Sequence, residues 1–149
     1  MPQNRHTIFI AAPADEVFKQ ALLWGEAKWW PKHSLMQFIR RSGEEIKIGT
    51  IYRQKVKLPF GPQWEVAINE IVPVQRVSRN FLNGIFKGRE MVLVIPQTFG
   101  CQVDYVLDYE INGKINKLLW KIFFQRLHDE NLKLILESMR EYILKEVRQ

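Results

Sequence analysis

Residues 101–147, CQVDYVLDYEINGKINKLLWKIFFQRLHDENLKLILESMREYILKEV, decide the fold. Residues 101–111 alternate between two sets of side chains, which is typical of a β-strand. One face would carry Cys101, Val103, Tyr105, Leu107 and Tyr109, and the other Gln102, Asp104, Val106, Asp108 and Glu110. Residues 116–147 contain no proline or glycine and repeat apolar side chains every three or four positions, which predicts one long helix. This helix is large enough to cover the apolar face of a sheet.

The preceding residues supply the rest of that sheet. A short β run is predicted at 7–11, followed by a helix at 13–23 that begins with Pro13 and a second short helix at 24–30. Further strands are predicted at 35–41, 50–58, 64–72, 77–82 and 85–95, the last two joined by the turn pair Asn83-Gly84. The fold class is therefore α+β, with a curved antiparallel sheet of about seven strands gripping a long C-terminal helix and two short helices after the first strand.

The composition is that of an ordinary globular protein and excludes several classes of site. The chain has 149 residues, 46% of them apolar and 26% charged, which predicts one globular domain over 1–149. Cys101 is the single cysteine, so an internal disulfide and a cysteine-based zinc site are excluded. Neither a membrane-spanning stretch nor a secretion signal is recognised, so we expect a cytoplasmic protein. The net charge of +6 is concentrated in residues 1–63 and is interpreted as a solvated basic surface, with no nucleic acid expected as a partner.

Three segments carry a resemblance to a known family. They are IFIAAPADEVF at 8–18, WEVAINEIVPVQRV at 64–77 and VDYVLDYE at 103–110. In this order the chain resembles the START-like (SRPBCC) helix-grip superfamily, and its polyketide cyclase/dehydrase and lipid-transport branch most of all. The resemblance implies a cavity for an apolar or amphipathic small molecule between the concave sheet face and the long helix. Members of this fold include lipid and quinone carriers, allergen-type binding proteins and aromatase/cyclases, so the resemblance does not specify one function.

Strand and helix periodicity then predicts which side chains would form the wall of that cavity. The predicted wall consists of Tyr52, Val56, Val66, Ile68, Arg79, Phe81, Met91, Leu93, Val103, Tyr105, Leu107, Phe124, Leu127, Asn131 and Ile135. Apolar walls with few polar groups are typical of small-molecule pockets, although a solid core has the same pattern. Glu70 and Arg79 have matching parity around Pro73, which predicts either a cross-strand pair inside the cavity or a structural pair.

Apolar residues in turns predict the entrance of the cavity. Phe60, Ile85 and Phe86 lie where polar residues are expected, next to Lys57 and Lys87. Such tips suit a transient contact with an anionic membrane surface, or they fold inward and plug the opening. The segment LLWKIFF at 118–124 is apolar nearly all round, which indicates burial, a protein partner or a membrane contact.

Other polar residues indicate no recognised catalytic or metal-binding motif. His6, His33 and His128 are far apart in the sequence, so we expect no metal site and no cofactor. Asp104, Asp108 and Glu110 are interpreted as solubilising charges on the outer face of their strand.

The favoured hypothesis is a protein that binds or carries a lipid-, quinone- or polyketide-like molecule. The alternative is a cyclase/dehydratase-type enzyme in which Tyr105, Arg79, Glu70 or His33 acts as acid, base or oxyanion donor. The sequence leaves open whether the protein is an enzyme, which ligand it binds and its oligomeric state.

Overall fold

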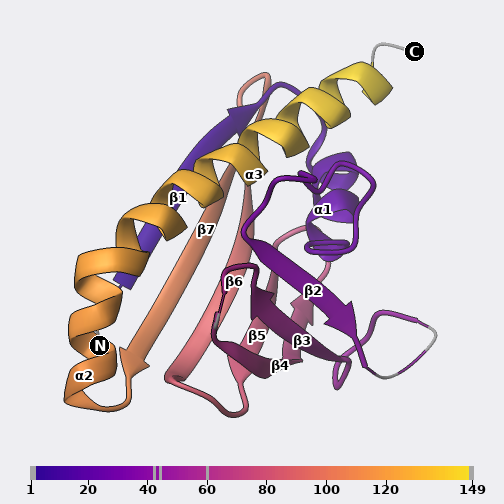
Figure 1. Cartoon of the computed structure of the whole chain (residues 1–149). Coiled ribbons are helices and arrows are strands. Elements are labelled where there is room, and N and C mark those ends of the chain that lie inside the picture. Colours follow the sequence, from indigo (N-terminus) through magenta and orange to yellow (C-terminus); the bar gives the residue numbers. More distant parts are fainter. Residues whose placement is uncertain (1–2, 42, 44, 60, 148–149) are drawn as a thin grey trace.

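The computed structural model describes residues 3–41, 43, 45–59 and 61–147 and contains one curled antiparallel sheet gripping a long C-terminal helix (Figure 1). The strands are β1 (Gln3–Ile10), β2 (Met36–Arg40), β3 (Ile51–Val56), β4 (Gln63–Val72), β5 (Arg76–Phe81), β6 (Phe86–Gln97) and β7 (Gly100–Ile111). The helices are α1 (Ala14–Leu22), α2 (Lys114–Leu119), the π-helical turn η1 (Trp120–Phe124) and α3 (Gln125–Val147). The predicted fold class is confirmed in its sheet and its long helix.

The sheet order is β1-β7-β6-β5-β4-β3-β2, so the first strand of the chain pairs with the last. Figure 1 shows α3 running along β1 and β7, while the strands from β5 to β2 curl away from it. The side of α3 that faces the sheet carries the buried residues Leu132, Ile135, Leu136, Met139 and Ile143. Burial of this apolar stripe is the main force that holds the helix on the sheet. No helix among the described residues is long and apolar enough to cross a membrane.

The second short helix predicted at 24–30 is wrong, because this segment forms consecutive turns. Gly25 adopts a positive φ of 89°, and a Cβ atom at this position would lie 2.3 Å from the Phe38 ring. The turns allow Trp24, Trp29 and Trp30 to pack against one another, with ring centroids 5.4 to 6.0 Å apart. Tertiary packing of three indole rings therefore outweighs the local helical pattern.

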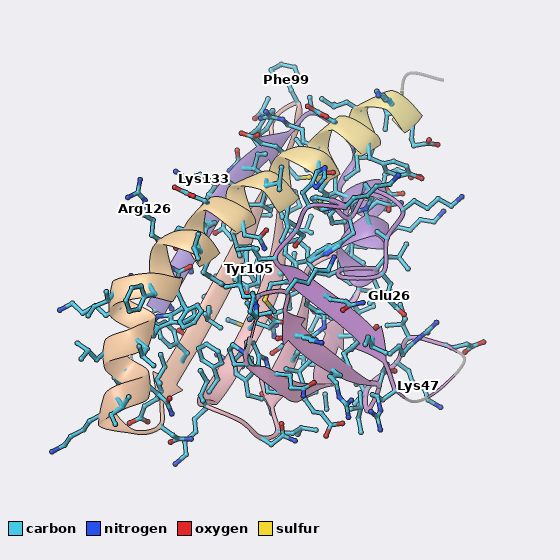
Figure 2. The ribbon with its side chains drawn as sticks, in the orientation of Figure 1. Glu26, Lys47, Phe99, Tyr105, Arg126 and Lys133 are labelled. Carbon is cyan, nitrogen blue, oxygen red and sulfur yellow. The ribbon has the colours of Figure 1, made fainter. Side chains whose placement is uncertain are left out.

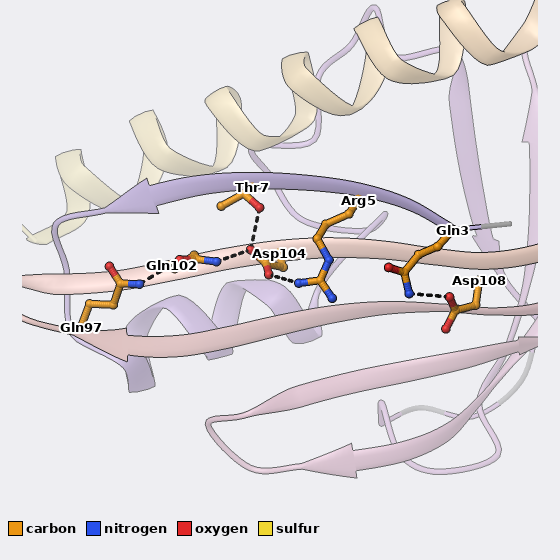
Figure 3. Close-up of polar contacts among 7 residues, drawn as sticks. All are labelled: Gln3, Arg5, Thr7, Gln97, Gln102, Asp104 and Asp108. Carbon is orange, nitrogen blue, oxygen red and sulfur yellow. Dashed lines mark hydrogen bonds and ion pairs between the residues drawn. The ribbon is translucent and has the colours of Figure 1, made fainter.

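The interpretation of Asp104 as a solubilising charge is also wrong. Its side chain is fully buried, and it accepts hydrogen bonds from Arg5 Nη1 at 2.6 Å, Thr7 Oγ1 at 2.9 Å and Gln102 Nε2 at 2.9 Å (Figure 3). Arg5 and Thr7 belong to β1, which pairs with β7 through Thr7 and Asp104 themselves. A carboxylate that would be solvated on an isolated strand is thus enclosed by the neighbouring strand and fixes the β1–β7 edge.

Strand register corrects two further expectations. In β6, Glu90 pairs with Leu107 and Val92 pairs with Tyr105, so these residues share the concave face. Met91 and Leu93 alternate with them and point to the convex face, so their placement on the cavity wall is wrong. A shift of one residue in parity moves every side chain of a strand to the opposite face.

The predicted pairing of Glu70 with Arg79 is likewise not formed. The register between β4 and β5 shifts between Ile68 and Glu70, so Arg79 pairs with Ile68 and Glu70 pairs with Ser78. The Glu70 carboxylate instead contacts Arg76, with 2.6 Å between Oε1 and Nε, and both side chains are partly exposed. A bulge adds one residue to one strand and thereby changes which side chains meet across the ladder.

Candidate ligand-binding cavity

A cavity lies between the concave sheet face and the C-terminal helical segment. Its volume is about 60 Å³, and its wall is almost entirely apolar and aromatic. The lining residues are Trp24, Trp30, Leu35, Met36, Phe38, Gln54, Val56, Leu58, Trp64, Phe81, Phe86, Glu90, Tyr105, Leu107, Trp120, Phe124, Leu127, His128, Asn131, Leu132 and Ile135. Figure 2 shows Tyr105 at the centre of the molecule, beneath α3.

Sequence periodicity located part of this wall. Eight of the fifteen predicted wall residues line the cavity, namely Val56, Phe81, Tyr105, Leu107, Phe124, Leu127, Asn131 and Ile135. Five others, Tyr52, Val66, Ile68, Arg79 and Val103, are buried close to the concave face but do not line it. Of the predicted entrance residues, Phe86 lines the cavity, Ile85 is half-buried against the core, and Phe60 lies outside the described residues.

The main polar group of the cavity is Glu90, which sequence reasoning missed. Its Oε1 accepts a hydrogen bond from Gln54 Nε2 at 2.6 Å, and its Oε2 accepts one from the Tyr105 hydroxyl at 2.7 Å. Gln54 Oε1 in turn accepts a hydrogen bond from Trp64 Nε1 at 2.7 Å. All four side chains are buried, so the network presents a fixed carboxylate to an apolar cavity.

Arg79 supplies a buried positive charge next to this network. It pairs with Glu90 across β5 and β6, so both side chains lie on the concave face. Its guanidinium carbon is 5.5 Å from the centre of the Tyr52 ring, a cation–π distance. The residue is fully buried, and its three side-chain nitrogens have no hydrogen-bond partner in the described part of the chain. A buried guanidinium in this state depends on nearby negative charge for its stability.

The buried phenols of Tyr52 and Tyr105 resist ionisation. Burial raises the pKa of Tyr105 well above its ordinary value, and the Glu90 carboxylate adds to the effect. Burial likewise raises the pKa of Tyr52 to about 12, while the positive charge of Arg79 acts in the opposite direction. Both hydroxyls are therefore protonated at neutral pH and donate hydrogen bonds, Tyr105 to Glu90 and Tyr52 to Glu26 Oε2 at 3.1 Å.

A second polar cluster joins β1 to α3 at the side of the cavity. Asp129 Oδ1 is 3.1 Å from His6 Nε2 and accepts a hydrogen bond from Asn4 Nδ2 at 2.9 Å. The neighbouring His128, together with Asn4 and His6, lowers the pKa of Asp129 to about 2, so this carboxylate is ionised. Burial is the largest cause of a lowered pKa at His6 and outweighs the attraction of Asp129. The cluster thus connects two elements that are more than a hundred residues apart in the sequence.

The start of the C-terminal helical segment is exposed rather than buried. Ile115, Leu118, Ile122 and Phe123 are exposed by 76, 58, 57 and 59%. Trp120 and Phe124 on the same segment turn inward and line the cavity. The predicted alternatives of a protein partner or a membrane therefore stand, and burial within the chain does not explain these side chains.

Several lining residues lie outside the helices and strands of the structure, although the sequence predicted a helix at 24–30 and a strand at 35–41. Trp24, Trp30 and Leu35 lie in turns between α1 and β2, where neither strand nor helix parity applies. Glu90 lies four residues after Phe86 in β6, so strand alternation places both side chains on the same face. The sequence does not predict a buried Glu90, because carboxylates are rarely buried. His33 and Glu70, the other candidate acids or bases, do not line the cavity, and His33 is exposed.

Comparisons with known proteins identify the fold. No protein-family model matches the chain, and no curated protein matches it in sequence. Among solved structures, the Thermus thermophilus protein TTHA0849 is 22% identical with a TM-score of 0.72, over 97% of the chain and 99% of that protein. The Zhui aromatase/cyclase of a Streptomyces species is 15% identical with a TM-score of 0.72, over 98% and 95%.

A plant enzyme shares the same architecture. Norcoclaurine synthase from Thalictrum flavum, in a complex with dopamine and hydroxybenzaldehyde, is 14% identical with a TM-score of 0.69. The match covers 97% of the chain and 87% of that enzyme. Identities this low establish the architecture without a shared activity. The chain therefore has the fold of these solved structures, a curled antiparallel sheet gripping a long C-terminal helix.

Proposed function

We propose that the chain binds or carries an apolar or amphipathic small molecule of lipid, quinone or polyketide type in this cavity. The observation that carries the proposal is Glu90, a buried carboxylate that receives hydrogen bonds from Gln54 and Tyr105 on an otherwise apolar wall. Small-molecule sites combine such apolar walls with a few placed polar groups that orient the ligand. The remaining lone pairs of Glu90 and of the Tyr105 hydroxyl are acceptors, so the ligand is expected to carry a hydroxyl or amine donor.

The cavity is smaller than most small-molecule pockets, so a large ligand can bind only if the cavity widens. Small-molecule pockets usually enclose roughly 300–1000 Å³, whereas this cavity has about 60 Å³. A ligand with several rings or a long chain therefore requires side chains at the edge of the cavity to move outward. Phe81 and Phe86 stack with ring centroids 5.3 Å apart, and Trp120 lies 5.1 Å from Phe86. Rotation of these rings would widen the cavity without breaking the Glu90 network.

The test is mass spectrometry of the purified protein under native conditions, and again after denaturation and extraction into organic solvent. We expect a discrete small molecule that Phe124→Trp reduces by about tenfold, since the larger ring fills ligand space. Phe123→Trp is the matched control, because Phe123 is the neighbouring residue and is largely exposed. An empty wild-type protein that also fails to bind added apolar molecules bearing a hydroxyl or amine would contradict the proposal.

An enzyme of cyclase/dehydratase type is the second candidate. It is favoured by the placement of two ionisable groups, Glu90 and Tyr105, inside the cavity at hydrogen-bond distance from each other. Tyr105 as a proton donor and Glu90 as a base would suit proton transfer to and from a bound carbonyl compound. A change in the mass of the extracted ligand on incubation with the protein, absent with Glu90→Gln, would favour this candidate over a carrier.

We also propose that the exposed face of α2 and η1 docks on an anionic membrane while ligand enters or leaves. Its apolar residues alternate with Lys114, Lys117 and Lys121, and residues 111–128 contain no acidic side chain. Apolar side chains flanked by lysines are the composition of helices that lie in the headgroup region of anionic bilayers. Trp120 and Phe124 line the cavity from this same segment, so docking would place the cavity next to the lipid. The exchange would occur at the cytoplasmic leaflet, where anionic lipids are concentrated.

Vesicle co-sedimentation tests this docking surface. We expect binding to vesicles that contain phosphatidylglycerol, weaker binding to pure phosphatidylcholine, and a loss of roughly tenfold or more with Phe123→Asp. Phe99→Asp is the control, because Phe99 is 91% exposed and lies at the other end of the sheet from α2 (Figures 1 and 2). Equal binding by both variants, or self-association of the wild type through this face in place of lipid binding, would contradict the proposal.

A further inference from the structure

The fold brings two histidines together that the sequence separates. His6 lies on β1 and His128 on α3, and their ring centroids are 6.3 Å apart. Asp129 lies between them, with its Oδ1 atom 3.1 Å from His6 Nε2 and 3.8 Å from His128 Nδ1. One donor atom from each of the three residues lies within 4.8 Å of the other two. We expected no metal site because the histidines are far apart in the sequence. In the structure β1 pairs with β7 and contacts α3, which brings His6 close to His128.

Two nearby buried polar atoms have no hydrogen-bond partner among the described residues. His128 Nδ1 and Asn4 Oδ1 are buried and lack a hydrogen-bond partner within the described residues. Asn4 Nδ2 donates to Asp129 Oδ1 at 2.9 Å, so the amide oxygen of Asn4 belongs to the same cluster. Buried polar atoms are nearly always paired, so unpaired ones at a cluster of metal-ligand types point to an additional partner.

The donor set and its spacing favour a divalent transition metal ion. Imidazole nitrogen and carboxylate oxygen bind zinc at about 2.0–2.2 Å, which places neighbouring ligand atoms of a tetrahedral site about 3.3 Å apart. The observed separations of 3.1 and 3.8 Å require small side-chain adjustments to reach this geometry. Calcium and magnesium prefer sites built from oxygen atoms, so two histidines disfavour them.

We propose that His6, His128 and Asp129 bind one zinc-like divalent cation, with Asn4 hydrogen-bonded to the same Asp129 oxygen that faces both histidines. Three protein ligands leave a fourth coordination position for water or for a donor group of a ligand. His128 also lines the cavity, so the bound ion would fix the orientation of its ring at the cavity wall. The positive charge of Lys133, on the next turn of α3, acts on His6 and would oppose metal binding. The proposal is independent of the cavity ligand.

The test is titration of the full chain, without an affinity tag, with Co²⁺ and Zn²⁺ in competition with a chromogenic chelator. We expect one ion per chain and a visible absorption band of four- or five-coordinate Co²⁺. His6→Gln and Asp129→Asn should each weaken binding by about tenfold or more, since even the groups that support metal ligands carry effects of this size. His33→Gln is the matched control, because His33 is an exposed histidine of the same chain.

Each result of this titration decides for or against the site. Stoichiometric binding that is lost in both ligand variants and kept in His33→Gln supports it, provided that far-ultraviolet circular dichroism shows the variants to be folded. If a ligand variant is unfolded, His128→Gln is used in its place. Absence of binding to the wild type, or equal affinity in every folded variant, overturns it.

Discussion

Replacing Glu90 with leucine is expected to lower the free energy of unfolding by about 3–5 kcal/mol. The substitution leaves the guanidinium of Arg79 fully buried without the negative charge directly across the strand pair. It also removes the acceptor of the hydrogen bonds from Gln54 and Tyr105. Urea unfolding followed by tryptophan fluorescence measures the change.

A double-mutant cycle separates the charge effect from a general loss of packing. Arg79→Met combined with Glu90→Leu removes both charges, and this variant should be more stable than the sum of the two single changes by about 1–3 kcal/mol. Glu70→Gln is the control for loss of a carboxylate, because Glu70 forms a partly exposed pair with Arg76 and should change stability by less than about 1 kcal/mol. Additive single changes would mean that Arg79 does not depend on Glu90.

Replacing Trp24 with alanine should cost about 3–5 kcal/mol of stability, because a large buried ring is removed from a packed core. Trp24 is 1% exposed and stacks on Tyr105 with ring centroids 5.5 Å apart. It also contacts Trp29 and Trp30, so its removal affects the whole segment between α1 and β2. Thermal and urea unfolding measure the effect, and Phe99→Ala, at a residue that is 91% exposed, should change stability by no more than about 0.5 kcal/mol.

The same substitution tests whether the cavity stays open when its wall is cut back. Trp24 lines it, so Trp24→Ala enlarges it by the volume of an indole ring. An enlarged apolar cavity binds small aromatic molecules and is stabilised by them. Benzene should therefore raise the melting temperature of this variant more than that of the wild type. Equal shifts would show that the space collapses once the ring is removed.

The sequence by itself determined the last strand and the long C-terminal helical segment. Alternation along residues 101–111 and the uninterrupted apolar repeat of 116–147 predicted β7 and the helical segment from α2 to α3. Both signals are local and strong, because a two-residue or a 3.6-residue period arises from the geometry of one element alone. They also located eight wall residues, since the face of a strand or helix that is apolar is the face that packs inward.

Only the tertiary structure decided which polar groups meet. Glu90 was overlooked because its environment depends on Gln54, Tyr105 and Arg79, which three other strands supply. Asp104 was misjudged because β1, nearly a hundred residues earlier, encloses it. His6 and Asp129 likewise meet through the placement of α3 beside β1. Local periodicity shows which face of an element is apolar, but the enclosure and pairing of a charge depend on non-local contacts that no single segment encodes.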